Sequence, residues 1–233
     1  MMKNSCRWIS FILVVGVLAV YSTSCKKSDN TDQFQYGTAS DYEGNIYKTV
    51  AIGSQTWMAE NLRSIKLNDG TPIPYVSVNN TWSNMTSMAY SYYGNDSTTY
   101  KFKSGALYNW YTVDTKKLCP SGWHVPSNAD WVSLNTYLGV DTLAGGKLKD
   151  NSSAYWYSPN LHATNETGFT ALPCGYRFYN GSYNNYGLSG NWWTATEYST
   201  TSAWYRYLIY ADGKLGKNFY DKTYGFSVRC IKD

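Results

Sequence analysis

The sequence predicts an α+β domain with short mixed or antiparallel strands and one or two helices. Helical spacing follows Ser127, because Trp131, Leu134 and Leu138 would share one buried face. Short runs rich in aromatic and β-branched residues, separated by Gly, Asn and Asp, fill most of the chain beyond residue 190. One clear helix beside many short strands is the pattern of an α+β fold.

The first residues resemble a bacterial lipoprotein signal. Lys3 and Arg7 precede an apolar run at 9–20, and small residues lead to Cys25. We expect Cys25 to become the lipidated N-terminus, carrying palmitate-type chains, and Lys26 after it favours the outer membrane. The alternatives are an ordinary signal peptide or an uncleaved anchor. The expected organisation is a signal peptide at 1–24, a disordered tether at 25–37 and one domain at 38–233.

The charge of the mature chain argues against nucleic acid as a partner. The full sequence carries a net charge of +4. Removal of Lys3 and Arg7 with the signal takes away half of that excess, and no cluster of basic residues remains. A nucleic-acid surface needs a concentrated positive patch, so this class of partner is not expected.

The first predicted elements lie on either side of a tight turn. Residues 45–52 and 55–58 read as strands joined by Gly53 and Ser54, with Trp57 toward the core. Further on, 105–113 suits a short helix or a buried strand equally well.

The clearest helix follows a cap. A helix over 128–137 begins after Ser127, whose spacing to Asp130 predicts a capping box, and ends at Gly139. A second short helix or turn is expected at 143–149.

The C-terminal part predicts a sheet. Strands are expected at 168–172, 192–196, 203–210 and 214–220, and Asp212-Gly213 is typical of a type I′ hairpin turn. A last strand at 224–231 would close the sheet. Phe226, Val228 and Cys230 alternate along it, so Cys230 should face the core, where it could meet Cys119.

Cysteine usage points to a disulfide in an oxidising compartment. Cys6 belongs to the signal and Cys25 to the lipid anchor, which leaves Cys119, Cys174 and Cys230. One of these three must stay unpaired, and the count alone does not say which.

Five motifs in register carry a family resemblance. They are CPSGWHVPSNADW at 119–131, GALYNWY at 105–111, NWWTATEY at 191–198, AWYRYL at 203–208 and YGFSVRC at 224–230. Together they resemble the Fibrobacter succinogenes major paralogous domain from about residue 42 to 232. This resemblance implies a C-type-lectin-like fold on bacterial surface proteins, without a settled biochemical activity. Cys174 stands where the family usually has glycine, which implies that Cys174 is free and that Cys119 pairs with Cys230.

Catalytic and metal motifs are not found in the sequence. His124 and His162 lie outside any zinc-binding spacing, and packing beside its turn is the expected role of His124. The related formylglycine-generating enzymes use a pair of cysteines that Cys174 and Cys230 do not reproduce. Residues 158–160 lack the acidic ligands of a calcium-dependent lectin. We therefore predict a protein that is not an enzyme and needs neither a cofactor nor a metal.

Aromatic residues are the remaining candidates for binding. The chain has 24 tyrosines, more than a core of this size needs, and 176–187 has the Tyr, Asn, Ser and Gly content of recognition loops. The predicted ligand-binding residues are Tyr179, Tyr183, Tyr186, Trp193 and Tyr205. The alternative is that the tryptophans are core and the tyrosines only cover the sheet. Arg206 and Arg229 are expected to brace the sheet by hydrogen bonds.

The resulting hypothesis is a lipid-anchored outer-membrane protein, facing the periplasm or the cell surface, that binds a glycan or a surface protein through tyrosine and tryptophan. A structural or adhesin-like envelope protein is the alternative, followed by a formylglycine-generating type of enzyme.

Overall fold

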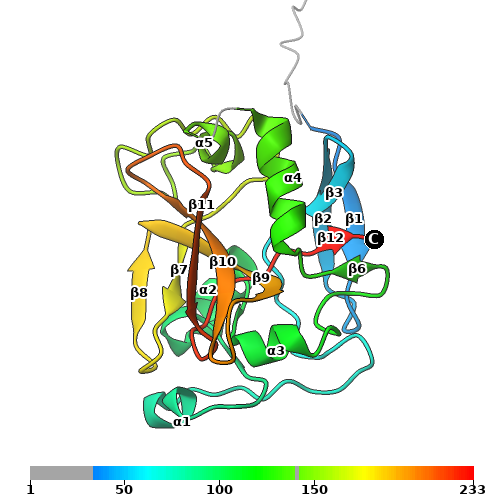
Figure 1. The fold of residues 1–233 in the computed structure, drawn as a ribbon, viewed down its shortest axis with the longest axis vertical. Coiled ribbons are helices and arrows are strands. Elements are labelled where there is room, and N and C mark those ends of the chain that lie inside the picture. The colour runs from blue at the N-terminus through cyan, green and yellow to red at the C-terminus, as the bar shows by residue number, and fades with distance from the viewer. Residues whose placement is uncertain (1–33, 140–141) are drawn as a thin grey trace, which may run out of the picture. The chain divides into compact units, whose positions relative to one another are not determined.

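Two five-stranded sheets form the framework of the domain (Figure 1). The computed structural model describes residues 34–139 and 142–233. The first sheet has the order β1-β2-β3-β12-β6 and the second the order β11-β10-β9-β7-β8, while β4 and β5 form a small third sheet. All pairs of named strands are antiparallel except β7 with β9. The strands are β1 (Gly37–Ser40), β2 (Ile46–Ile52), β3 (Gln55–Met58), β4 (Tyr90–Ser91), β5 (Leu107–Tyr108), β6 (Trp123–His124), β7 (Cys174–Arg177), β8 (Tyr183–Tyr186), β9 (Ser189–Glu197), β10 (Ser202–Ile209), β11 (Gly216–Asp221) and β12 (Ile231–Lys232).

The α+β class is confirmed, but the structure has more helices than the one or two that were expected. The described residues contain five α-helices and one 3₁₀ helix, and three of the α-helices have only five residues. Such single turns leave little periodicity in the sequence, which is why they are hard to predict. The six helices are α1 (Asn79–Ser83), η1 (Tyr93–Asn95), α2 (Ser97–Ser104), α3 (Trp110–Asp114), α4 (Asn128–Leu138) and α5 (Ala144–Leu148).

Helix α4 confirms the predicted capping box. The Ser127 hydroxyl accepts a hydrogen bond from the Asp130 amide at 3.3 Å, and the Asp130 carboxylate accepts one from the Ser127 amide at 2.8 Å. Trp131, Leu134 and Leu138 are buried. Gly139 ends the helix with a positive φ of 94°, a conformation that favours glycine.

One hydrophobic core lies between α4 and the two sheets. The Trp57 ring of β3 lies 4.8 Å from the Trp131 ring of α4, and Phe169 and Trp192 also pack on Trp131. Trp57 is therefore in the core, as predicted. A second core lies around Tyr108 and Phe226 and contains both ends of the Cys119–Cys230 disulfide.

The last segment is buried on both faces instead of being one regular strand. Phe226, Val228 and Cys230 enter the second core, which confirms the predicted alternation. Ser227 and Arg229 between them are also buried. Only Ile231–Lys232 forms a named strand, and residues 225–227 join their neighbours through single bridges.

Two strand predictions need correction. Residues 168–172 are buried around Phe169, but Thr170 has a φ of 54°, which interrupts an extended strand. Asp212 and Gly213 lie in a loop between β10 and β11, and Gly213 lacks the positive φ of a type I′ turn. The Gly213 carbonyl accepts a hydrogen bond from the Gly146 amide at 3.0 Å, so α5 fixes this loop.

The N-terminal predictions fall mostly outside the described residues. The signal peptide, Cys25 and the tether up to residue 33 belong to this part. The last residues of the expected tether join the domain, because the Tyr36 hydroxyl donates to the Gly168 carbonyl at 3.2 Å and β1 begins at Gly37. Within residues 34–139 and 142–233, no helix is long and apolar enough to cross a membrane.

Lys149 is a buried cation held by backbone oxygens. Its ammonium donates to the carbonyls of Leu161, Ile209 and Asp212 at 2.7, 3.1 and 2.8 Å. Desolvation lowers the pKa of Lys149 from 10.5 to about 8, although Asp212 opposes the shift. The side chain ties α5 to the loop between β10 and β11.

This lowered pKa predicts a pH dependence of stability. Between pH 8 and 10.5 the unfolded chain binds more protons at Lys149 than the folded chain does, so the free energy of unfolding should rise with pH there. Urea unfolding of wild type and Lys149→Met from pH 7 to 11 isolates this contribution, because other groups titrate in both proteins. The free energy of unfolding of wild type, measured relative to that of Lys149→Met, should increase between pH 8 and 10.5. A difference that does not change with pH would contradict the prediction.

Candidate functional site

Tyr183 and Tyr186 of β8 belong to a group of four rings, here called the tyrosine cluster: Tyr93, Tyr100, Tyr183 and Tyr186. The Tyr93 ring lies 5.3 Å from the Tyr100 and Tyr183 rings and 5.0 Å from the Tyr186 ring. All four are partly exposed at the edge of the second sheet. The Tyr183 hydroxyl also donates to the Asn95 side chain at 2.7 Å, so its ring is held in place.

Tyr179 lies in a different group of rings. This β11 ring cluster consists of Tyr176, Phe178, Tyr179, Tyr205, Tyr220 and Tyr224. Tyr179 is 50% exposed and lies 4.6 Å from the Phe178 ring. Tyr220 and Tyr224 stack at 4.4 Å with an angle of 7° between their planes. The structure therefore divides the predicted tyrosines between two surfaces.

Trp193 and Tyr205, which were predicted to bind ligand at the surface, are buried in the structure. Trp193 is 0% and Tyr205 6% exposed. The Trp193 indole donates to the Tyr108 carbonyl at 2.8 Å, and its ring lies 4.4 Å from Phe226. Ser227 forms a parallel bridge with Trp192 of β9, and the neighbouring Phe226 ring packs on both Trp193 and Tyr205, which the strand pattern alone could not reveal.

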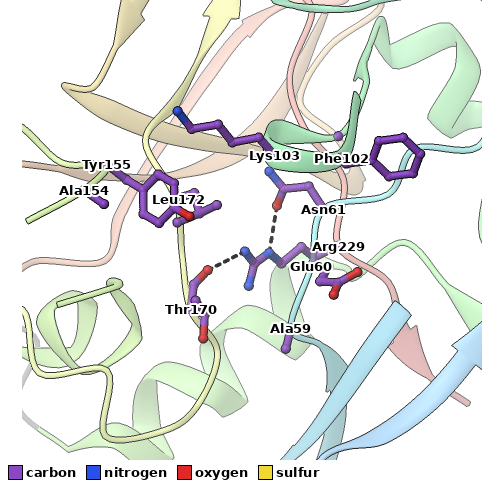
Figure 2. A pocket seen from close by; sticks show the side chains of 11 residues that line it. Ala59, Glu60, Asn61, Phe102, Lys103, Ala154, Tyr155, Thr170, Leu172 and Arg229 are labelled. Carbon is purple, nitrogen blue, oxygen red and sulfur yellow. Dashed lines mark hydrogen bonds between the residues drawn. The ribbon is translucent and has the colours of Figure 1, made fainter. Parts of the chain in front are cut away.

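Figure 2 shows the residues that line a pocket of about 670 Å³. We call it the Arg229 pocket. Its walls come from the segment after β3, from α2, and from the loops at 154–155 and 170–172. The lining residues are Ala59, Glu60, Asn61, Phe102, Lys103, Gly105, Ala154, Tyr155, Thr170, Leu172 and Arg229.

Asn61 organises the floor of this pocket. Its side-chain oxygen accepts hydrogen bonds from the Trp192 indole at 2.9 Å and from Arg229 Nε at 2.8 Å. Its amide nitrogen donates to the Ser104 carbonyl at 2.8 Å and to the Ser227 hydroxyl at 3.2 Å. Four separate segments thus meet at one buried amide.

Arg229 brings a positive charge to the floor. Its guanidinium is 1% exposed and donates to Asn61 and to the carbonyls of Phe169 and Thr170. These partners lie outside the named strands, so the hydrogen bonds join the segment after β3 to the loop at 169–170 instead of bracing the sheet. Among the described residues no carboxylate lies within ion-pair distance of it. Desolvation lowers the pKa of Arg229 to about 9, so the group still carries its charge at neutral pH.

Lys103 connects the pocket to the tyrosine cluster. Its ammonium lies 5.3 Å from the centre of the Tyr155 ring and 5.6 Å from that of Tyr186. A hydrogen bond with Tyr186 raises the pKa of Lys103, which keeps the amine charged. Pocket and rings therefore form one continuous candidate surface.

The cysteines are arranged as expected. Cys119 and Cys230 form a disulfide, and Cys174 is free and buried. Burial raises the pKa of the Cys174 thiol to about 11, so it stays protonated at neutral pH. A protonated, enclosed thiol is a poor nucleophile.

His124 lies among carboxylates at the edge of the first sheet. Its Nδ1 is 2.6 Å from an Asp233 oxygen, and its Nε2 is 3.5 Å from an oxygen of the cap residue Asp130. A pocket of about 330 Å³ adjoins it. Within the described ranges, no group of three His, Cys, Asp or Glu side chains is arranged to hold a metal ion.

A family model matches most of the domain in sequence. The family model of the Fibrobacter succinogenes major domain matches residues 50–232. The chain belongs to this family. No curated protein and no solved structure matches the chain. In this member of the Fibrobacter succinogenes major domain family, the matched range includes the disulfide, the Arg229 pocket and both ring clusters.

Sequence reasoning missed the pocket itself. Asn61 and Lys103 lie far apart in the chain and in segments without a recognisable motif. From the sequence, Arg229 is expected only to brace the sheet. A signal does exist, because a charged residue within an alternating apolar strand needs buried partners, but the sequence does not identify them.

Proposed function

We propose that this domain is a non-catalytic binding module that recognises a glycan through the tyrosine cluster and the adjoining Arg229 pocket. The observation that carries the proposal is the position of Lys103, which lines the pocket and lies over the Tyr186 ring. A concave site with a few convergent polar groups beside aromatic rings has the usual composition of a ligand site. Tyrosine rings that are already fixed by their neighbours offer a sugar a rigid apolar surface, so little side-chain entropy is lost on binding.

The proposal includes a place in the cell envelope. It is supported by the sequence alone, through the signal-like residues at 1–24 and the lipobox-like cysteine at position 25. A lipid anchor at Cys25 in the outer membrane would hold the domain at the membrane surface by its N-terminal side. Radiolabelled palmitate incorporation into wild type, and its loss in Cys25→Ala, tests this part.

A structural or adhesin-like role is the second candidate, and the outer edge of β11 favours it. This strand ends the sheet order, and most of its residues are exposed, including Phe219 and Tyr220. Among the described residues its outer edge has no partner strand. An exposed edge can accept a strand from another protein, with the β11 ring cluster beside it supplying apolar contacts.

An enzyme of the formylglycine-generating type finds less support. That chemistry, as the family resemblance describes it, needs two reactive cysteines. Here Cys119 and Cys230 are joined to each other, and the Cys174 thiol is enclosed and protonated. Binding without catalysis is therefore the role we propose.

Paired tyrosine substitutions separate the two binding roles. Tyr183→Ala in the full chain should weaken glycan binding by about threefold to tenfold, the loss expected for one stacking ring. Tyr179→Ala removes an equally large ring from the other cluster and should leave glycan affinity unchanged. A glycan array, with and without calcium, followed by calorimetric titration of any sugar found, gives the measurement.

The opposite pattern would favour the second candidate. If no glycan binds the folded, oxidised chain while Tyr179→Ala changes its assembly with envelope proteins, the glycan proposal fails. Melting temperatures of both variants serve as the control for folding.

A further inference from the structure

Arg229 and Lys103 bring two positive charges to the pocket, and the acidic residue in its lining already forms an ion pair elsewhere. Glu60 is the one carboxylate among the lining residues, and it pairs with Arg63 at 3.0 Å. Figure 2 shows the Arg229 guanidinium between Thr170 and Asn61, with Glu60 and Phe102 on one side and Tyr155 on the other. The pocket therefore has an excess of positive charge.

The Arg229 guanidinium retains donors after its contacts with the protein are counted. A guanidinium has five N–H groups. Its bonds to Asn61, Phe169 and Thr170 use three of them in the part of the chain that the structure describes. A buried charge is costly when no carboxylate lies within ion-pair distance, and a planar carboxylate is the group that best matches the remaining donors.

Aromatic rings beside these cations point to a sugar as the carrier of the carboxylate. Phe102 is 76% exposed on one wall, and Tyr155 lines the other, with the Lys103 ammonium 5.3 Å from the Tyr155 ring. The volume of about 670 Å³ admits more than one sugar ring. Rings bind the apolar face of a sugar, while the cations bind its acidic substituent.

We infer that the Arg229 pocket binds the carboxylate of a uronic acid residue in an acidic glycan, with Arg229 at the floor as its hydrogen-bonding partner and Lys103 at the rim adding positive charge. This inference rests on the proposed glycan-binding function and names the substrate class. It also explains why Lys103 both lines the pocket and lies over Tyr186 of the tyrosine cluster, because neighbouring sugar residues would continue from the pocket onto the rings.

A matched pair of ligands and a matched pair of lysines test the inference. The full chain is titrated with a uronic acid trisaccharide and with the same trisaccharide after reduction of its carboxyl groups. Wild type should bind the acidic form at least about tenfold more tightly, and this preference should fall as salt is raised. Lys103→Gln should reduce affinity for the acidic form by about fivefold and leave affinity for the reduced form unchanged.

Lys101→Gln is the control. Lys101 lies on the same helix and contacts Phe102, but it does not line the pocket. It should leave both affinities unchanged. Arg229→Met should remove the preference for the acid, but it also breaks three structural bonds, so Lys103→Gln, which removes an exposed side chain, carries the test.

The outcomes separate this inference from the proposed function. Equal affinity for acidic and reduced sugars, or equal losses in Lys103→Gln and Lys101→Gln, would overturn the carboxylate site. If Tyr183→Ala still weakened binding of the neutral sugar, the glycan function would stand alone. Absence of binding to any sugar by the folded chain would overturn both.

Discussion

Replacing both Cys119 and Cys230 by alanine should lower the free energy of unfolding by about 4 kcal/mol. The disulfide joins residues 111 positions apart, and closing a loop of that length removes much of the conformational freedom of the unfolded chain. Both cysteines are buried in the core around Phe226, so the change also removes packed sulfur atoms. Urea unfolding of wild type and the double variant measures the difference.

Cys174→Ala provides the control for that experiment. Cys174 is equally buried but makes no cross-link, so its loss should cost the packing of one small side chain and the hydrogen bond from Asn61 to its sulfur, about 1 kcal/mol in all. Changing both partners of the disulfide also prevents a leftover thiol from pairing with Cys174. If the double variant proved as stable as Cys174→Ala, the disulfide would not be a main source of stability.

Trp193→Ala should cost about 3 to 5 kcal/mol and lower the melting temperature clearly. The side chain is fully buried, and its removal leaves a large cavity next to Phe226 and Tyr205. It also leaves the Tyr108 carbonyl without the indole donor at 2.8 Å. Thermal and urea unfolding give the measurement, and any change in glycan affinity should follow only from unfolding.

Trp204→Ala is the matched comparison on the adjacent strand. Trp204 is only partly buried and packs against Tyr198 and Phe219 at the surface, so its loss should cost less than half as much. Equal losses in the two variants would contradict the assignment of Trp193 to the core. Weaker ligand binding by a Trp193→Ala protein of unchanged stability would restore Trp193 as a binding residue.

Local features of the fold were predictable because their causes lie within a few residues. Ser127 and Asp130 form a capping box through their own backbone and side-chain groups, so spacing alone identifies the start of α4. Gly53 and Ser54 connect two strands that pair directly, which makes β2 and β3 visible in the same way. Asp212 and Gly213 carried the same kind of turn signal, yet the distant Gly146 and Lys149 hold that loop in another conformation.

The candidate site was only partly predictable. Composition identified Tyr183 and Tyr186 as surface rings, but it gave Trp193 the same standing. The pocket floor depends on Asn61, which contacts residues as far as 168 positions away in the chain. Such contacts leave no periodic trace, since each partner is an ordinary residue in its own segment.

The sequence by itself determined the family, the α+β class, the capped helix and the alternation that directs Cys230 inward, because each depends on spacing along the chain. Only the tertiary structure decided which rings are exposed and where charges gather. Residues 225–227 pair beside β9 and place Phe226 against the buried Trp193, while Arg229 and Lys103 line one pocket from separate segments. Burial and convergence are properties of chain packing in three dimensions, and that packing assigns the same residue type to a core or to a binding surface.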